Sequence, residues 1–492
     1  MIIERGLGES TLVVPVPSNR GICKACYIQE DSDEIDREER IMEFKKVIVA
    51  GAGKSGIAST ELLLRHGAEI VMFDQKADLD TSKLDERFGG KVAFELGELS
   101  DKTISESDLF VISPGIPTDA DFVKKVEAAG VPIMGEIELG YYFGKGKIAA
   151  ITGTNGKTTT TALVGEIFKA YSEDYVVAGN IGYPLTEYSD TTTDETLISL
   201  EVSSFQLETI NTFRPHVSAV LNLTPDHLNR HYTLDNYYNA KLRIAENQDM
   251  SDYMVANYDD PETRERVAAA IKNTNIVWFS RKEELENGVF VSDGSIRLKD
   301  KDTDVIILDL SDIKILGTHN VENVLAATAI AYYMGIPAEV IKKTVSEFNG
   351  VEHRIQFVRE LNGVKFYNDS KGTNPDAAIK AIEAMKGQTV LIGGGYDKKS
   401  TYDEWVELFP GKVRKLVLIG ATADDIEKCA RKHGFTDIAR AATLKEAVEY
   451  SYSVAESGDN VLLSPACASW DMFKSFEERG TLFVEYVNGL EG

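Results

Sequence analysis

The segment KIAAITGTNGKTTTTALVGEIFKAY, residues 147–171, decides the fold class. The apolar run at 147–151 predicts a buried strand, and the stretch 160–171 predicts a helix. Between them, residues 152–159 read TGTNGKTT and place two glycines and a lysine where the strand turns into the helix. Successive backbone N–H groups in such a turn can surround a polyphosphate. The segment therefore predicts an α/β sheet with a nucleotide site, for which we expect ATP.

Each residue type in this turn has an expected task. The Lys157 amine can reach the terminal phosphate oxygens, and the Thr158 hydroxyl can hold Mg²⁺. The spacing is shorter than in the usual phosphate loop, since only two residues separate Gly153 from Gly156. A glycine turn without a ligand is the alternative. The ATP-binding residues predicted here are Gly153, Thr154, Asn155, Gly156, Lys157, Thr158 and Thr159.

Apolar runs alternate with helix-length stretches along most of the chain, which is typical of mainly parallel sheets covered by helices. The runs fall into three groups, so we predict three α/β domains. Their expected limits are 44–136, 137–350 and 351–492. Residues 1–43 carry an acidic run at 30–36 and are expected to form a poorly ordered arm, with the compact protein starting near Met42.

Charge and composition exclude several classes of function. The chain has 492 residues, and 53 Lys and Arg against 79 Asp and Glu give a net charge of −26. Such a charge repels nucleic acids and anionic lipid surfaces. No apolar run approaches the roughly 18 residues of a membrane span, and four cysteines are too few for a disulfide framework. We expect a cytoplasmic monomer without membrane insertion, and treat the C-x-x-C of Cys23 and Cys26 as incidental.

A second glycine-rich turn, GAGKSG at 51–56, follows a predicted strand and precedes a helix. Asp74 ends the next predicted strand about twenty residues later, where an acid can accept ribose or base hydrogens. This arrangement predicts a site for a diphosphate nucleotide. A purely structural turn remains the alternative.

Polar residues follow two later strands of the central group, in EVSSFQ at 201–206 and NLTPDH at 222–227. Because ligands collect at the carboxyl ends of such strands, Glu201 is expected to hold Mg²⁺ beside Thr158. His227 is expected to contact a second metal ion or the substrate, rather than to be an ordinary loop histidine. Lys241, in the predicted helix 238–244, has the composition of an ordinary solvated lysine.

Asn320 and Asn323 precede a predicted helix at 324–333, and could either cap that helix or hydrogen-bond a purine. In the third group, three polar loops each follow an apolar strand and should meet at one sheet edge. Arg354, Lys371 and Lys398 are cations of this group, as a dianionic small acid would require. The alternative is that these three cations are unrelated charges on the protein surface.

Taken in order, these motifs resemble the Mur ligases. The resemblance rests on GTNGKTT, EVSSFQL, NLTPDHLNRH, AKLRI, GTHNVEN, VEHR, NDSKGTNPDA, GGGYDK and SPACASWDMFKSFEERG, and it extends from about residue 44 to the end of the chain. EVSSFQL and the last motif are similar to the member that adds D-glutamate. The D-N-P-R segment of the member that adds a diamino acid is absent.

The resemblance implies a UDP-binding domain, a central ATPase domain and a Rossmann-like C-terminal domain that swings shut. It implies that ATP and two Mg²⁺ ions serve to join D-glutamate to UDP-N-acetylmuramoyl-L-alanine through an acyl phosphate, in peptidoglycan precursor synthesis. Lys241 would then be carbamylated and bridge magnesium. At Trp470 and Lys76 this sequence departs from relatives that carry leucine and arginine.

The implied site residues fall into four sets. The UDP-substrate set is Lys54, Ser55, Asp74, Gln75, Lys76, Gly115, Asn180 and His227. The ATP set adds Asn320, Asn323, Arg354 and Asp369 to Lys157 and Thr158. The metal set is Thr158, Glu201, His227 and carbamylated Lys241, and Lys157, Glu201, His227 and Lys241 are the implied catalytic residues. The D-glutamate set is Lys371, Thr373, Lys398, Ser469, Trp470 and Phe476.

Other functions fit parts of the sequence. Another ATP-dependent ligase of acids and amino acids, such as a folylpolyglutamate-type enzyme or another Mur ligase, would use the same phosphate loop. A nicotinamide-dependent dehydrogenase would use the turn at 51–56 and Asp74 but leave residues 153–159 without a task. A non-catalytic nucleotide-binding scaffold is a weaker alternative.

Overall fold

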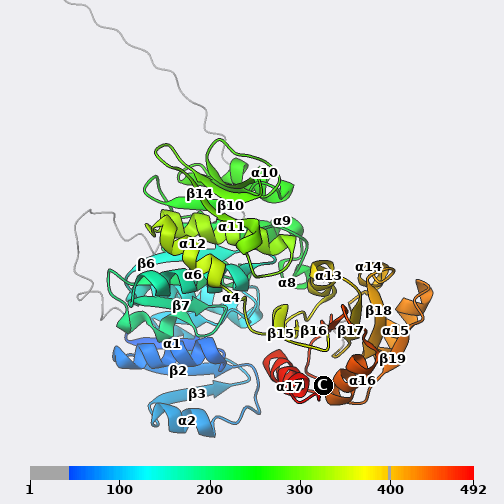
Figure 1. The fold of residues 1–492 in the computed structure, drawn as a ribbon. Coiled ribbons are helices and arrows are strands. Elements are labelled where there is room, and N and C mark those ends of the chain that lie inside the picture. The colour runs from blue at the N-terminus through cyan, green and yellow to red at the C-terminus, as the bar shows by residue number, and fades with distance from the viewer. Residues whose placement is uncertain (1–43, 397–399, 492) are drawn as a thin grey trace, which may run out of the picture.

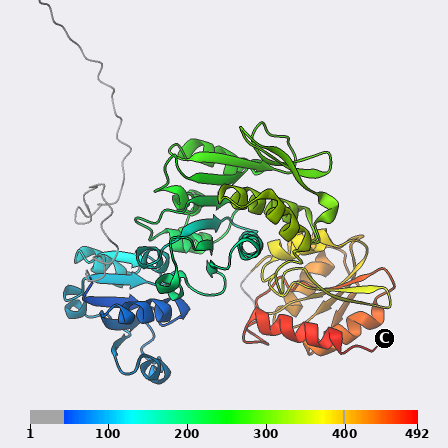
Figure 2. The ribbon, with the colours of Figure 1, turned by 60° about the vertical axis from the view of Figure 1, so that its left-hand side comes forward.

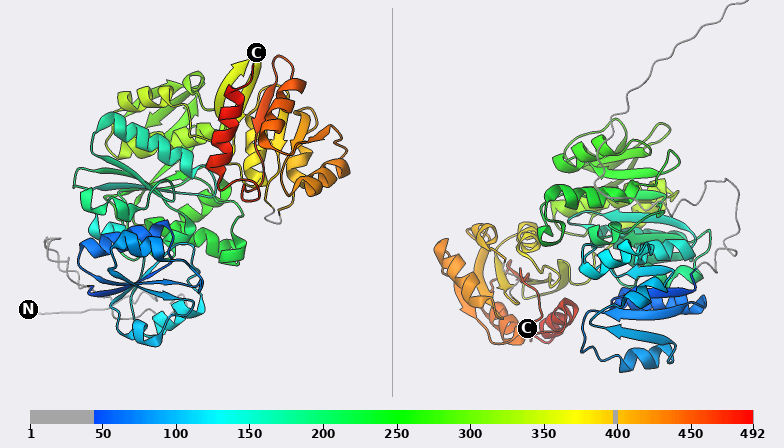
Figure 3. Two further views of the ribbon diagram at one scale, coloured as in Figure 1. Left: turned by 90° about the horizontal axis from the view of Figure 1, so that it is seen from below. Right: turned by 180° about the vertical axis from the view of Figure 1, so that it is seen from behind.

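The computed structural model describes residues 44–396 and 400–491, and it shows three α/β units (Figure 1). The first and central units are stacked, and the third lies beside them, as further views also show (Figures 2 and 3). The predictions for the arm 1–43, for Cys23 and Cys26, and for Lys398 concern positions outside the described residues.

The first unit is a fully parallel sheet in the order β3-β2-β1-β4-β5. Separate apolar cores cover its two faces. Its strands are β1 Lys46–Ala50, β2 Glu69–Asp74, β3 Val92–Leu96, β4 Leu109–Ile112 and β5 Ile133–Gly135; its helices are α1 Lys54–Arg65, α2 Ser82–Phe88, α3 Asp101–Ser105 and α4 Asp121–Ala128.

The central unit has nine strands in the order β14-β13-β12-β11-β10-β9-β6-β8-β7, with antiparallel pairing only at β12-β13 and β13-β14. The strands are β6 Lys147–Thr152, β7 Tyr175–Gly179, β8 Leu197–Glu201, β9 Val217–Val220, β10 Tyr253–Asn257, β11 Asn275–Ser280, β12 Gly288–Ser292, β13 Ser295–Lys299 and β14 Asp304–Asp309. The helices are α5 Glu136–Phe143, α6 Lys157–Tyr171, α7 Ser204–Leu207, α8 Leu228–His231, α9 Leu234–Leu242, α10 Pro261–Ala270, α11 Thr318–Tyr333 and α12 Ala338–Glu347, with 3₁₀ turns η3 Leu185–Glu187, η4 Ser189–Thr191, η5 Arg243–Ala245 and η6 Leu310–Asp312.

The third unit has the strand order β15-β16-β20-β17-β18-β19, with one antiparallel pair, β15-β16. Its strands are β15 Gln356–Leu361, β16 Val364–Asn368, β17 Thr389–Gly393, β18 Val413–Leu418, β19 Ile438–Arg440 and β20 Asn460–Leu463. Its helices are α13 Pro375–Ala384, α14 Asp403–Glu407, α15 Ala423–Lys432, α16 Leu444–Val454 and α17 Phe476–Asn488. The expected fold class, three mainly parallel sheets covered by helices, is confirmed.

Helix α5 joins the first two units, because Leu139 belongs to the core of the first and Ile137 to that of the second. Its two buried carboxylates, Glu136 and Glu138, both accept hydrogen bonds in this joint. Glu138 accepts hydrogen bonds from three backbone N–H groups at 211–213, and Glu136 accepts from the N–H and hydroxyl of Thr186. Such contacts hold the first unit firmly against the central one.

Two helices begin earlier than the sequence pattern predicts. The helix expected at 160–171 is α6, which starts at Lys157, directly after Gly156. The helix expected at 324–333 is α11, which starts at Thr318. Apolar periodicity misses these first turns because their side chains are polar and face a site rather than a core. None of the helices within residues 44–396 and 400–491 has the length and apolar character needed to cross a bilayer.

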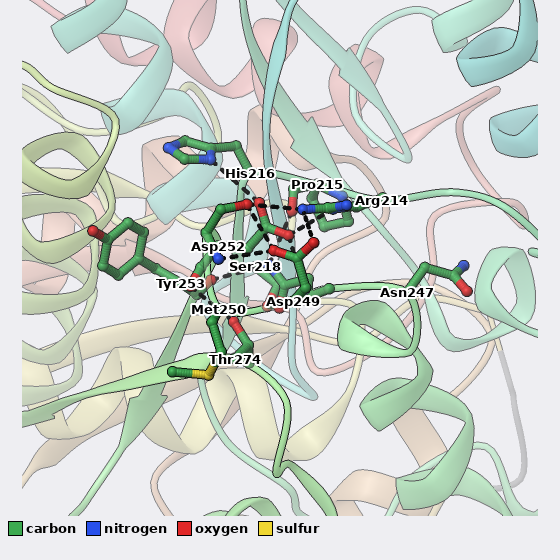
Figure 4. Close-up of polar contacts among 12 residues, drawn as sticks. Arg214, Pro215, His216, Ser218, Asn247, Asp249, Met250, Asp252, Tyr253 and Thr274 are labelled. Atoms are coloured by element: carbon green, nitrogen blue, oxygen red, sulfur yellow. Dashed lines mark hydrogen bonds and ion pairs between the residues drawn. The ribbon is translucent and has the colours of Figure 1, made fainter. Parts of the chain in front are cut away.

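A dense polar cluster lies at the amino ends of β9 and β10 (Figure 4). The buried Asp252 carboxylate accepts from Arg214 Nε at 2.7 Å and lies 3.3 Å from His216 Nδ1, while Asp249 pairs with Arg214 at 2.6 Å. These contacts fix the two loops that enter neighbouring strands. The phosphate loop is at the other end of the sheet, so we assign this cluster to the structure of the domain.

Candidate active site

The phosphate loop between β6 and α6 is held in place by the segment that follows β9. Thr154 N donates to Asn222 O at 3.0 Å, and Asn155 N donates to Asn222 Oδ1 at 2.8 Å. The Thr154 hydroxyl donates to Thr224 O at 3.0 Å. These bonds fix the loop from one side and leave its other side for a ligand.

Both glycines of the loop are required by its geometry. Gly153 and Gly156 have φ of +151° and +86°, in a region that side chains disfavour. A Cβ atom at Gly156 would also lie 2.3 Å from Asn323 Oδ1. The short spacing noted in the sequence is therefore compatible with a tight turn against α11.

Two lysine side chains converge on one carbonyl oxygen of the loop. Lys157 Nζ donates to Gly153 O at 2.7 Å and to Thr154 O at 2.8 Å. Lys241 Nζ, from α9, donates to the same Gly153 O at 2.9 Å. The amines are thus placed directly at the loop in which we predicted the phosphates.

The expectation that Lys241 is a solvated lysine is wrong, because its side chain is 1% exposed and lies over the Tyr237 ring. Burial lowers the pKa of Lys241 well below its usual value, and the charge of Lys157 lowers it further. Burial also lowers the pKa of Lys157. The contact of Lys241 with Gly153 O of the phosphate loop is a tertiary contact, which helix composition does not reveal.

Glu201 ends β8 beside β6, paired in register with Ile151. It is 2% exposed, and Asn180 Nδ2 donates to its Oε1 at 2.8 Å. Its other oxygen, Oε2, is buried and has no hydrogen-bond partner among the residues that the structure describes. An unpartnered buried carboxylate oxygen is costly unless a cation or donor meets it. Hard oxygen donors such as this one and the Thr158 hydroxyl fit Mg²⁺.

His227 lies at the start of α8 in a left-handed conformation, with φ of 52°. Its side chain is 47% exposed, its Nε2 lies 3.5 Å from Asp226 Oδ2, and its ring meets Phe205 edge-on. Nearby, Arg230 donates to Ile116 O in the first unit and to Glu208. The segment that carries His227 is thereby fixed to the loop 113–117, which contains Gly115.

Three residues of this region have tasks that we did not predict from the sequence. The charge of Asp226 acts on both Lys157 and Lys241. Asn222 fixes the loop, and Tyr237 covers Lys241 and donates to Thr154 Oγ1 at 3.3 Å. Asp226 could have been found, since it precedes His227 at a strand's carboxyl end. Asn222 lies in the same polar segment after β9, whereas the task of Tyr237 becomes visible only when α9 is packed on the loop.

Asn320 and Asn323 lie inside α11, so the capping alternative is wrong; Gly317 precedes the helix. Asn320 Nδ2 donates to Leu316 O at 2.6 Å, and Asn323 Nδ2 donates to Asn320 Oδ1 at 2.9 Å. Both residues line a cavity of about 700 Å³ that also borders Asn155, Gly156 and Arg354. The cavity therefore lies between the phosphate loop and the third unit.

The third unit contributes a buried carboxylate, Asp369, at the end of β16. Ser464 Oγ and Ile355 N donate to it at 2.8 and 3.2 Å, and Arg354 lies 3.8 Å away. Burial raises the pKa of Asp369 to about 6. Lys371 lies over the Phe476 ring, and burial lowers its pKa while the charge of Glu201 in the central unit opposes that shift.

A buried arginine organises the loops that carry the predicted D-glutamate residues. Arg479 is fully buried and donates to Ser370 Oγ and O and to the carbonyls of Cys467 and Ala468. Ser469, directly after this segment, is 2% exposed, whereas Trp470 is 63% exposed and faces Tyr396. Thr373 follows Lys371 in the loop before α13. Arg479 is absent from the predicted site residues, because nothing in the sequence marks it as buried.

The predicted UDP residues lie at the carboxyl ends of β1, β2 and β4. Gly56 is required there, because a Cβ would lie 1.8 Å from Gly51 O. Asp74 accepts from Ala52 N at 3.1 Å and from Lys76 N at 3.0 Å, so its carboxylate fixes the loop. Lys54, Gln75, Lys76 and Gly115 are exposed and Ser55 is partly exposed around this loop.

A phosphate loop in the central unit, with cations of the third unit facing it, defines a class: three-domain α/β enzymes that use a nucleotide. The chain belongs to the Mur ligase family. Residues 45–135 match the Mur ligase MurD-like N-terminal domain, 151–331 the Mur ligase middle domain, and 353–467 the Mur ligase glutamate ligase domain.

Two relatives match this chain over almost the whole of their own length. The UDP-N-acetylmuramoylalanine–D-glutamate ligases of Lachnoclostridium phytofermentans and Thermoanaerobacter pseudethanolicus are 49% and 51% identical over 91% of this chain and 98% of theirs. Among solved structures, the MurF ligase of Thermotoga maritima in complex with ADP is 17% identical, with a TM-score of 0.55 over 91% of this chain and 96% of that one. The MurC ligase of the same organism is 18% identical, with a TM-score of 0.54 over 90% and 99%. These two structural similarities show a shared fold only.

Proposed function

We propose that the protein is an ATP-dependent ligase that joins D-glutamate to UDP-N-acetylmuramoyl-L-alanine. The names of the relatives at about half identity support the substrates. The observation that carries the chemistry is the convergence of Lys157 and Lys241 on Gly153 O, beside the unpartnered Oε2 of Glu201.

A carboxylate is a poor acylating group until its oxygen is made a leaving group. In the proposed reaction, the L-alanine carboxylate attacks the γ-phosphorus of ATP, which gives an acyl phosphate and ADP. The amine of D-glutamate then attacks the acyl carbon, and phosphate leaves with the former carboxylate oxygen. The first step builds negative charge on the transferring phosphoryl group, which the Lys157 ammonium can stabilise.

Two Mg²⁺ ions would supply further charge neutralisation and orient the reacting oxygens. Thr158, Glu201 and His227 would hold them, together with Lys241 once carbamylated. Carbamylation requires a neutral amine that can attack carbon dioxide, and the lowered pKa of Lys241 favours that form. The donor set therefore suits the ions, and Asn180 would orient Glu201.

The other sets complete the proposal. Arg354, Asn320 and Asn323 border the cavity next to the loop, where the nucleoside of ATP would bind, and Asp369 lies 3.8 Å behind Arg354. Lys371, Thr373, Ser469, Trp470 and Phe476, with Lys398, would hold D-glutamate. Lys54, Ser55, Asp74, Gln75, Lys76 and Gly115 would bind the UDP group, and Asn180 and His227 would meet the muramoyl-alanine end.

Release of phosphate, measured with ATP and UDP-N-acetylmuramoyl-L-alanine while each D- and L-amino acid is offered in turn, tests the proposal. We expect phosphate release only when D-glutamate is the amino acid that is offered. Turnover with a folate acceptor, or with another amino acid only, would overturn the substrate assignment. Lys157→Ala should lose most ADP formation but still bind the UDP substrate, and ADP formation at near the original rate would overturn the phosphate-loop assignment.

Closure of the third unit over the central one would exclude the water that hydrolyses an acyl phosphate. Small-angle scattering with and without an ATP analogue and the UDP substrate measures this closure. We expect a smaller radius of gyration with both ligands, and an unchanged curve would contradict closure.

A further inference from the structure

Helices α14 and α15 of the third unit lie away from β6 and α6, which flank the phosphate loop (Figure 1). These two helices bring three different metal-binding side chains together. Asp403 begins α14, whereas Cys429 and His433 are one helical turn apart at the end of α15. One ligand atom from each lies within 4.8 Å of the others, and all three residues are partly buried. None of these three residues has a role in the proposed reaction.

We propose that Asp403, Cys429 and His433 form a binding site for a divalent transition-metal ion of the zinc type. A thiolate, an imidazole and a carboxylate together favour Zn²⁺ or Co²⁺ over Mg²⁺ and Ca²⁺, which prefer oxygen ligands alone. Three protein ligands leave the fourth tetrahedral position to water. On binding, the Cys429 sulfur bonds to the metal and its proton leaves to solvent.

The geometry orients the imidazole for this task. His433 Nε2 lies 2.8 Å from Asp403 Oδ1, so this nitrogen faces the carboxylate ligand. Its other nitrogen, Nδ1, lies 3.7 Å from Glu407 Oε1 on the next turn of α14. A carboxylate on the far side of a ligating histidine fixes the ring and raises its basicity. Glu407 is within ion-pair distance of Nδ1 but does not hydrogen-bond it.

Small movements would be enough to close the site. Bond lengths of about 2.0–2.3 Å in a tetrahedral zinc site put ligand atoms roughly 3.3–3.7 Å apart, compared with at most 4.8 Å here. His433 also directly follows α15, where the last carbonyl groups of the helix favour a cation.

One side chain competes with the metal. Lys432 Nζ donates to Asp403 Oδ1 at 2.7 Å, and its side chain is 70% exposed. Because an exposed lysine can move into solvent at little cost, the metal would replace it as the partner of Asp403. This competition predicts that Lys432→Gln binds the metal more tightly than the unaltered chain.

Cobalt binding to the full chain tests the site, in a background with Cys23→Ser and Cys26→Ser that removes the other C-x-x-C sulfurs. Excess Mg²⁺ occupies the oxygen sites. We expect one equivalent of Co²⁺ per chain with a thiolate-to-cobalt charge-transfer band, abolished by Cys429→Ser and kept by Cys467→Ser. Asp403→Asn and His433→Gln should weaken binding at least about tenfold.

The controls separate this site from adventitious binding. His216→Asn alters a histidine that also pairs with a carboxylate, Asp252, but without a thiol, so it should leave the band unchanged. Zn²⁺ should raise the melting temperature of the background chain and not that of Cys429→Ser, whose ADP formation reports correct folding. A band that is absent, or that persists in Cys429→Ser, would overturn the proposal. If Cys429→Ser does not fold, unaltered affinity in Asp403→Asn and His433→Gln would overturn it equally.

Discussion

Lys157 and Lys241 donate to the same acceptor, Gly153 O, at 2.7 and 2.9 Å. Two ammonium groups so close to one oxygen repel each other, and both lie where water is largely excluded. Burial lowers the pKa of both, and the charge of Lys157 lowers the pKa of Lys241 further. The site is prepared for anionic ligands, and for loss of the Lys241 proton.

Lys241→Ala should abolish most ADP formation, because it removes the amine that we propose to be carbamylated. A small carboxylate such as formate should restore part of the activity, since it can replace the carbamate oxygens. Steady-state ADP release with and without formate measures this. Lys169→Ala, on the exposed side of α6, is the matched control. Equal activity of Lys241→Ala and the unaltered enzyme would contradict the role.

Lys241 also determines a pH dependence of stability. Because its folded-state pKa is lowered, the unfolded chain binds more protons, so stability rises with pH between the lowered pKa and the ordinary value of 10.5. Lys241→Met removes this buried amine and should raise the melting temperature most at the low-pH end of that window. Calorimetry over a pH series measures the effect, and a lower melting temperature throughout would contradict it.

Asp369 contributes a pH dependence of stability with the opposite sign. Its pKa rises from 3.8 to about 6, so the folded state holds a proton that the unfolded state releases. Stability is therefore greatest below pH 4 for this group and is lost as pH rises through 6, by up to about 3 kcal/mol. Asp369→Asn should recover part of this stability at neutral pH in denaturant unfolding, while ATP turnover falls. Ser453→Ala, at an exposed serine of α16, should change neither.

Gly156→Ala should lower activity strongly, because the new Cβ would lie 2.3 Å from Asn323 Oδ1 and φ is +86°. The KM for ATP should rise and the melting temperature should fall. Gly489→Ala is a suitable control, since its Cβ would meet no atom closer than 3.5 Å. Identical kinetics in the two variants would show that the loop does not bind the phosphates.

Asn155 in the phosphate loop donates to Asp376 Oδ2 at 2.8 Å, across the boundary between the central and third units. A triphosphate would repel this carboxylate. Asp376→Asn should therefore lower the KM for ATP, by at most about fivefold because the pair is exposed. ATP titration of ADP release measures this, with the exposed Asp121→Asn as control. A higher KM would mean that the carboxylate assists ATP.

The sequence by itself determined the sheet class and the location of the phosphate loop, because short-range patterns specify both. Strand, glycine turn and helix follow one another at 147–171, and the carboxyl ends of parallel strands necessarily meet at one edge. Glu201 and Asp369 could be placed at those edges for the same reason.

Only the tertiary structure decided which side chains lose contact with water. Lys241 and Arg479 have the composition of surface residues, yet each is buried by segments distant in the chain. Their lowered pKa values follow from burial, which depends on three-dimensional packing. The pairing of Cys429 and His433 with Asp403 likewise depends on how α14 packs against α15, since Asp403 and Cys429 are 26 positions apart in the sequence.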